Sequence, residues 1–399
     1  MANTLEIIDM ITSESLLTLH ESLSFVPTIN RSYDDSFGKE GAKIGDSLRI
    51  RKPARFEVTT GRVMNTQPIT DEKVSLTVAT QKNVSMQFTS AEMALGIDYL
   101  SDRYIKPAMQ QLAAIVEYDV LAGVTPKVGN LTGTAGTAMS DLAALGDARS
   151  RLNGQSAPMR DRSIVLDSLQ MSSMVNGLKG LFQDSGQIKE AMREGFYGRL
   201  AMGDLYENEK LYTLTNAGDV AGTLNTVTLA NGATSLSVAN FSAAPTAGMV
   251  FTLAGVYACH PETKQSLGYL KQFVIGTVNG TSTTSTLYID EAIYVSGARQ
   301  NVVVSSSYST TGAVTFVGSA STSYRQGLMY HKDAFAFVTA DLPIMSGDCV
   351  RKSQDGISLR VWRQDDIRND EALTRVDILY GYQAIRPEWA CRLIGAASA

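Results

Sequence analysis

Apolar and polar residues follow two different periods along the first 90 positions. Over residues 4–23, leucine and isoleucine recur near helical spacing with acidic residues between them, which predicts an N-terminal helical arm within residues 1–42. Over residues 47–88, apolar and polar residues alternate at the period of a strand on both sides of a polar, turn-rich stretch. We expect an extended two-stranded loop over residues 43–89. An isolated hairpin is marginal in water, so we expect another subunit to complete its packing.

The strongest helical signal of the chain lies at residues 90–123. Pro107 suits a first helical turn, and Gly123 ends the pattern. Mixed helical patterns follow as far as residue 215, around one short apolar strand at residues 163–167. We expect residues 90–215 to form a long helix and the first part of an α+β body. The apolar stripe of the long helix comprises Met109, Leu112, Val116 and Val120.

Charged residues become rare in residues 216–325. Only eight of these 110 positions are charged, against 19% for the whole chain, and short Thr- and Val-rich runs alternate with turn dipeptides such as Asn231-Gly232 and Asn279-Gly280. This composition predicts an inserted all-β, barrel-like domain. A more highly charged pattern, like that of residues 1–215, returns over residues 326–399, which we expect to complete the body that the insertion interrupts.

Composition excludes several classes of protein. The three cysteines, Cys259, Cys349 and Cys391, are widely spaced and odd in number, which argues against a disulfide framework and favours a reducing compartment. The net charge of −5 argues against a dedicated nucleic-acid binder, because binding through phosphates needs a concentrated basic surface. Nothing in the sequence has the length of apolar run that a membrane-spanning helix needs.

Candidate catalytic chemistry is sparse. The histidines, His20, His260 and His331, are isolated from one another, and neither a nucleotide-binding glycine loop nor a G-x-S-x-G nucleophile motif occurs. His260 follows Cys259 and could form a soft ligand pair with it, but an ordinary strand-to-turn junction fits the surrounding residues better. We therefore predict no catalytic site, no metal site and no cofactor.

A basic cluster marks the first strand of the predicted loop. Contact with DNA, ion pairing with a neighbouring subunit and an ordinary solvated hairpin all fit these residues. We expect the strand period to spread the side chains over both faces, which favours the second and third interpretations over the first. The intersubunit contact candidates are Arg49, Arg51, Lys52, Arg55 and Arg62, with Lys43 just before them.

Five segments together resemble the coat proteins of short-tailed double-stranded DNA bacteriophages that carry an inserted β-domain. The resemblance implies the tailed-phage major capsid fold, an α+β fold with an N-terminal arm, an extended loop, a peripheral domain on a long spine helix, and an axial domain. In such shells the extended loop lies over a neighbouring subunit. The segments are residues 45–58, 88–113, 248–275, 329–343 and 374–395.

The resemblance also implies a function. The chain would assemble with itself into an icosahedral shell of hexamers and pentamers, guided by a scaffolding protein, with a portal protein at one vertex and DNA enclosed without sequence-specific binding. Shell expansion would follow, and assembly would take place in the host bacterial cytoplasm. An enzyme with a β-rich accessory domain, and a tail or surface binding protein, remain the alternatives.

The N-terminal helix is the candidate scaffold contact. Its residues Glu6, Asp9 and Glu14 precede the first basic residue of the chain, Arg31. A basic helical tip of the scaffolding protein would dock against this acidic face. A merely solvated helix face, with acids near the positive end of the helix dipole, remains open.

Overall fold

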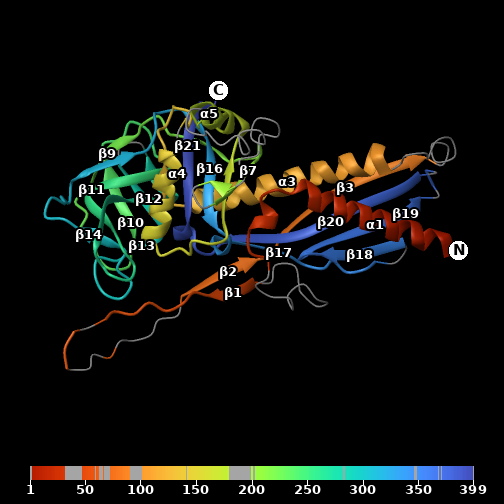
Figure 1. Cartoon of the computed structure of the whole chain (residues 1–399), viewed down its shortest axis with the longest axis horizontal. Helices are drawn as coiled ribbons and strands as arrows, with labels where there is room; N and C mark the ends of the chain where they lie inside the picture. Colours follow the sequence, from red (N-terminus) through yellow and green to blue (C-terminus); the bar gives the residue numbers. More distant parts are fainter. Residues whose placement is uncertain are drawn as a thin grey trace. The chain divides into compact units, whose positions relative to one another are not determined.

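The computed structural model describes residues 2–31, 47–58, 60–62, 66, 72–89, 101–140, 142–178, 199–200, 203–281, 284–345, 348–366, 368–369 and 371–398. The chain forms two compact units (Figure 1). Unit 1 comprises Met1–Ile50, Lys73–Val120 and Phe335–Ile385, and unit 2 comprises Arg51–Glu72, Leu121–Ala334 and Arg386–Ala399.

Unit 1 is built on an antiparallel sheet. Its strands run in the order β17 (Phe335–Thr339), β20 (Glu371–Ala384), β19 (Ile357–Asp366) and β18 (Asp348–Gln354), and β3 (Thr80–Thr89) also pairs with the long β20. The α+β character that the sequence predicted is confirmed by this sheet and the helices that accompany it.

Two helices pack in unit 1. The helix predicted over residues 4–23 forms as α1 (Ala2–Ser22), which packs against β18, and its Leu16 and Leu19 are buried. The long helix α3 (Lys106–Val124) continues a single π-helical turn at Ser101–Ile105, and its predicted stripe from Met109 to Val120 is buried. Residues 90–100 of the predicted helix lie outside the described residues.

The extended loop is shorter than the sequence predicted. Strand β1 (Ser47–Arg51) pairs with β2 (Lys73–Thr77), but residues 52–58 belong to no strand and β3 leaves the loop to join β20. The base of the loop has apolar partners within the chain, although they are not near it in sequence. Ile50, Leu76 and Val78 pack into a buried cluster with residues between 336 and 385, too remote in sequence for a local pattern to reveal.

Unit 2 contains a mixed sheet with two helices. The strands run in the order β4 (Leu131–Thr132), β21 (Ala390–Ser398), β16 (Ser323–His331), β5 (Arg162–Leu166), β7 (Gly203–Glu207) and β6 (Arg199–Leu200), and β8 (Thr213–Thr215) also pairs with β16. Helices α4 (Ala143–Gly154) and α5 (Ser168–Leu178) contribute Leu145, Leu152 and Met174 to its core.

The second sheet of unit 2 closes into a barrel. The strand order is β12-β13-β10-β9-β15-β11-β14, and β11 also pairs with β12. Aromatic and branched side chains such as Phe251, Phe273 and Leu287 fill its interior. The predicted barrel-like insertion is confirmed as a fold. The strands are β9 (Ala221–Leu224), β10 (Ala233–Ala239), β11 (Val250–Cys259), β12 (Ser266–Thr281), β13 (Thr284–Ile293), β14 (Val302–Val304) and β15 (Ala313–Phe316).

The sequence predicted three turn dipeptides in the barrel, and two of them, Asn231-Gly232 and Thr311-Gly312, lie at turns. Asn231-Gly232 makes a turn in which Gly232 has a φ of 85°, a conformation that glycine adopts without strain. Asn279 and Gly280 instead lie within β12, which continues to Thr281. The dipeptide alone could not show that the strand runs past it.

Candidate functional site

The basic residues of β1 share one exposed face. Arg49 and Arg51 are exposed while Ile50 between them is buried, so the strand period places both arginines on the same side. The expected spread of the whole basic cluster over both faces stays a prediction, and this pair shares one face. Arg62 is also exposed, and Lys43 lies outside the described residues.

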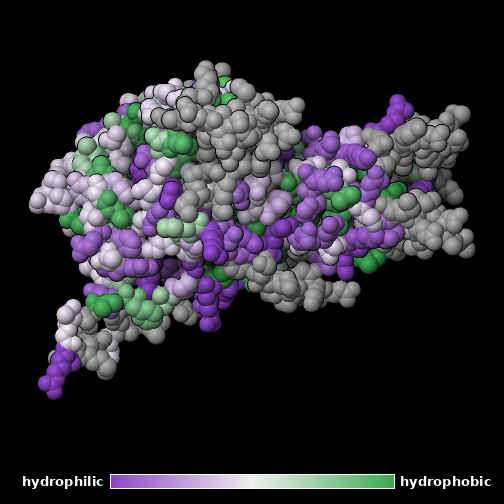
Figure 2. All heavy atoms as spheres, in the orientation of Figure 1, coloured by the Kyte–Doolittle hydropathy of each residue, from purple (hydrophilic) through white to green (hydrophobic). Residues whose placement is uncertain are grey.

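Residues 51–62 and 72, here called the arm, expose large apolar side chains. Phe56 is 60% exposed and Val58 is 92% exposed. Figure 2 shows hydrophobic and hydrophilic residues together along the arm. Burying a side chain of this size contributes about 1.5–3 kcal/mol, so two such residues on one extended segment are suited to a surface that another chain covers.

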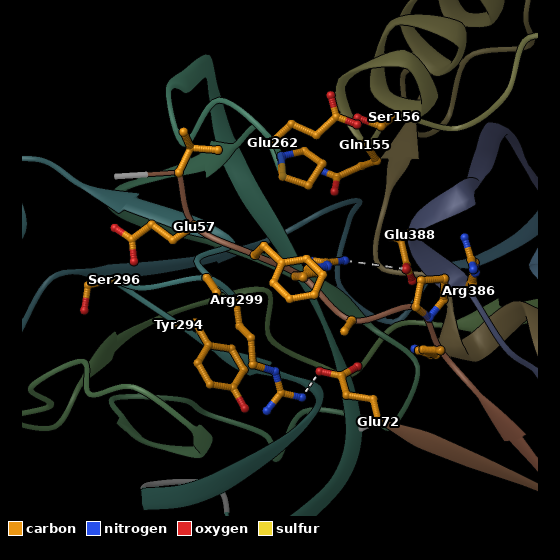
Figure 3. Close-up of a pocket in the computed structure, with 18 of the residues that line it drawn as sticks. Glu57, Glu72, Gln155, Ser156, Glu262, Tyr294, Ser296, Arg299, Arg386 and Glu388 are labelled. Carbon is orange, nitrogen blue, oxygen red and sulfur yellow. Dashed lines mark ion pairs between the residues drawn. The ribbon is translucent and has the colours of Figure 1, made fainter. Parts of the chain in front are cut away.

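A hollow of about 710 Å³ lies beside the arm within unit 2. Arm residues 52–58 form one wall, loops of the barrel between residues 231 and 299 form another, and residues 155–156 and 386–389 complete it (Figure 3). Its charged lining is balanced. The basic residues are Lys52, Arg55, Arg299 and Arg386, and the acidic residues are Glu57, Glu72, Glu262 and Glu388.

Ion pairs and ring contacts order the walls of the hollow. Arg299 pairs with Glu72, and its guanidinium lies 4.8 Å from the ring centroid of Tyr294. Arg55 lies 3.8 Å from Glu388. Figure 3 shows both ion pairs spanning from the arm to the rest of the unit. The arm is therefore attached to its own subunit at its base, while Phe56 and Val58 remain exposed.

Comparison with known proteins identifies the chain. The model of the family described as P22 coat protein, gene protein 5, matches residues 1–395. The chain belongs to the P22 coat protein family. It is a structural major capsid protein that forms the icosahedral shell of a double-stranded DNA bacteriophage, and its place is the virion capsid.

The chain is also similar to solved phage structures. The chain resembles a structure of Mycobacterium phage Che8 with a TM-score of 0.52 and 14% identity, covering 93% of this chain and 90% of that one. A structure of Gordonia phage Cozz matches with a TM-score of 0.44 and 11% identity, covering 94% and 87%. No curated protein sequence matches the coat protein. The first of these likenesses supports the tailed-phage major capsid fold.

The acidic residues of α1 face lysines of the same subunit. The Asp9 carboxylate lies 2.7 Å from the Lys352 ammonium, and Glu14 lies 3.8 Å from Lys106. The side chain of Glu6 lies outside the described residues. The sequence did not reveal these pairings, because Lys352 is separated from Asp9 by most of the chain.

Two buried charges of the coat protein escaped sequence reasoning. The Glu117 carboxylate accepts the backbone N–H groups of Ser24 and Phe25, which fixes the chain just after α1. The Arg392 guanidinium donates to the carbonyl oxygens of Val128, Pro126 and Gly248, and burial lowers the pKa of Arg392 to about 10. A charged residue within an apolar strand, such as Arg392 in β21, is the one signal that the sequence offered.

The residues considered for metal or redox chemistry lie apart. Among the described residues, no group of three potential ligands is placed to hold a metal ion, and the three cysteines are free. His260 follows the end of β11, where its Nδ1 accepts the N–H groups of Glu262 and Thr263, as expected for a strand-to-turn junction. No described helix is long and apolar enough to cross a membrane.

Proposed function

We propose that the coat protein assembles as hexamers and pentamers in which the arm of each subunit lies over a neighbouring subunit. The exposure of Phe56 and Val58, together with the basic face of Arg49 and Arg51, carries this proposal. Covering these apolar side chains supplies affinity, and the arginines meet acidic side chains of the neighbour and fix the register. Arg62, further along the arm, and Lys52, at its base, are secondary candidates for the same contact.

We propose the remaining steps of assembly on the basis of the resemblance to short-tailed phage coat proteins. A scaffolding protein guides closure of the shell in the host bacterial cytoplasm, a portal protein occupies one vertex, and the shell expands as DNA fills it. DNA is enclosed without sequence-specific binding, in keeping with the net charge of −5. In this proposal the subunit acts through its surfaces and carries no catalytic site and no cofactor.

The scaffold contact is proposed at α1, through Glu6, Asp9 and Glu14. Lys352 and Lys106 already neutralise Asp9 and Glu14 within the subunit. A basic scaffold segment would therefore exchange with these lysines. Exposed ion pairs contribute about 0–1 kcal/mol, so such an exchange costs little.

Reversing the charge of β1 tests the arm contact. The variant Arg49→Glu/Arg51→Glu should form closed shells at less than about a tenth of the wild-type yield, because a deficit of about 1.4 kcal/mol per contact is already tenfold in affinity. Shell yield is measured by sedimentation and negative-stain microscopy. The monomer's melting temperature should stay nearly unchanged, since both side chains are exposed.

A matched control is Arg363→Glu, which reverses an arginine of β19 paired with Asp365 of its own strand. It should assemble normally. Normal shell yield from the β1 variant would contradict the proposed contact.

A further inference from the structure

The loop between β13 and β14 is unusually well fixed for a surface loop. Asn301 closes its base: the amide Oδ1 accepts the N–H of Tyr294 at 2.9 Å, and Nδ2 donates to the carbonyl oxygen of Ala292 at 2.8 Å and to Glu291 at 3.0 Å. The Glu291 carboxylate in turn pairs with the buried Lys271 at 2.8 Å. Burial opposes ionisation of Glu291, but Lys271 and Asn301 outweigh it and hold its pKa below the ordinary value.

Two further side chains hold the middle of this loop. The Asn231 Oδ1 accepts the N–H groups of Val295 at 2.7 Å and Ser296 at 3.1 Å, and the Lys264 ammonium donates to the carbonyl oxygen of Ala298 at 2.6 Å. Connecting loops are generally the mobile parts of a fold. Here Asn301 at the end of the loop and side chains from two other segments of the barrel, Asn231 and Lys264, satisfy the loop backbone, which indicates that the position of the loop matters.

The fixed loop presents Arg299 to the base of the arm. The Arg299 guanidinium lies over the Tyr294 ring and pairs with Glu72, as Figure 3 shows. The carbonyl oxygen of Glu72 accepts the N–H of Lys52 at 2.8 Å, so Glu72 stands where the two limbs of the arm meet. Arg299 therefore contacts the point where the described ends of the two limbs are hydrogen-bonded to each other.

The outgoing limb is also in electrostatic reach of the barrel. Burial lowers the pKa of Lys264, nearby Arg55 lowers it further, and Glu57 opposes the shift. Arg55 pairs in addition with Glu388. Each of these arm contacts is partly exposed and adds little to stability. Together these contacts are suited to holding the arm in one orientation beside the barrel.

We propose that the inserted barrel braces the arm of its own subunit, with Arg299 as the positioning residue and Glu72 as its partner. Orienting the arm before assembly removes part of the ordering cost that a free arm would incur on docking. The inference rests on the proposed arm contact only for its consequence in assembly. The brace itself is a property of the monomer.

Proteolysis of the monomer tests the brace directly. Chymotrypsin cleaves after exposed aromatic residues, and Phe56 lies in the arm. We expect Arg299→Glu to raise the cleavage rate at Phe56 at least threefold, because like charges then meet at Glu72. The swapped pair Glu72→Arg/Arg299→Glu should restore the wild-type rate. Arg299→Gln, the milder change, should give an intermediate rate.

Arg325→Glu is the matched control. Arg325 is exposed to the same degree as Arg299, 35% against 33%, and pairs with Glu209 rather than with the arm. It should leave cleavage at Phe56 unchanged. An unchanged rate in Arg299→Glu, or a swapped pair that fails to restore it, would overturn the brace.

Shell yield then separates the two proposals. Reduced yield in Arg299→Glu, restored by the swap, supports the brace as a determinant of assembly. Normal yield in Arg299→Glu overturns that consequence. If Arg49→Glu/Arg51→Glu assembles normally while the cleavage results hold, the arm contact fails and the brace stands, since cleavage is measured on the monomer.

Discussion

Single buried charges connect segments of the coat protein that are far apart in sequence. Glu117 of α3 accepts the backbone N–H groups of Ser24 and Phe25, and Arg392 of β21 donates to carbonyl oxygens of two other segments, residues 126–128 and Gly248. Removing either would leave backbone groups without partners, at about 1–3 kcal/mol for each buried group. Each of these two residues therefore stabilises a contact between segments that are far apart in sequence.

His331 should make the coat protein sensitive to mild acid. Burial lowers its pKa; Asp333 and Asp161 oppose the shift, and Arg162 and Arg386 add to it. A lowered pKa means that the unfolded chain binds more protons than the folded one below the ordinary value of about 6.5. Stability is therefore fully present above a pH of about 6.5 and should fall as the pH decreases below it.

Urea unfolding of the monomer at pH 7.5 and pH 5.5 measures this effect. In the wild type the N–H of Asp333 donates to the imidazole Nδ1 of His331. His331→Asn keeps an acceptor for this N–H but removes the imidazole, so it should reduce the loss of stability at pH 5.5. Equal acid sensitivity in the wild type and His331→Asn would contradict the assignment to His331.

Elements with a strong local period were predictable, and elements defined by remote pairing were not. The stripe of α3 and the alternation in the barrel strands are local, and both structures formed. Strand β3 has an equally clear alternation, but its partner β20 lies near the other end of the chain, so the sequence assigned β3 to the hairpin. The same reason hid Lys352 as the partner of Asp9 and Arg299 as the partner of Glu72.

The barrel should fold as a separate element. Its described core draws almost entirely on residues 216–325, and closure by β11 and β12 satisfies strands that would otherwise be edges. We expect a fragment of these residues to show the circular dichroism of a β protein and a cooperative thermal transition. A fragment ending at residue 304 lacks β15, which pairs with β9 and β11, and should not fold. A disordered longer fragment would refute the prediction.

The molecule as a whole was recognisable from the order of its segments more than from any motif. N-terminal helix, extended loop, long helix, inserted barrel and returning body follow one another in the sequence as they do in the fold, which is why the family could be inferred without a catalytic signature. The assembly surfaces were harder to predict, because side chains that meet another copy of the chain are exposed in the single subunit, and no local pattern marks the residues that they will contact. Arg49 and Arg51 were found by composition, whereas the apolar exposure of Phe56 and Val58 required the structure.

Scaffold binding should depend on salt. Screening shortens the Debye length from about 10 Å at 0.1 M to about 3 Å at 1 M, so binding through Asp9 and Glu14 should fall steeply across that range. Glu6→Gln/Asp9→Asn/Glu14→Gln should reproduce the loss at low salt, measured by sedimentation of coat with scaffold.

Lys352→Gln should change the affinity for scaffold in the opposite direction to the acid-to-amide variant. It removes the lysine that neutralises Asp9 within the subunit and should strengthen scaffold binding, while the acid-to-amide variant weakens it. If both variants recruit scaffold at the wild-type level, the contact lies elsewhere on the coat protein.

Closure of the barrel affects how the coat protein behaves at high protein concentration. An open sheet offers rows of unpaired backbone groups on which another chain can polymerise. Pairing of β11 with β12 removes that template, and β14, which pairs with β11 alone among the described strands, is only three residues long. In a shell, where copies of the chain lie side by side, we expect this β-rich insertion to resist edge-to-edge polymerisation. In the proposed assembly, the geometry of the shell is determined by side-chain contacts such as those of the arm.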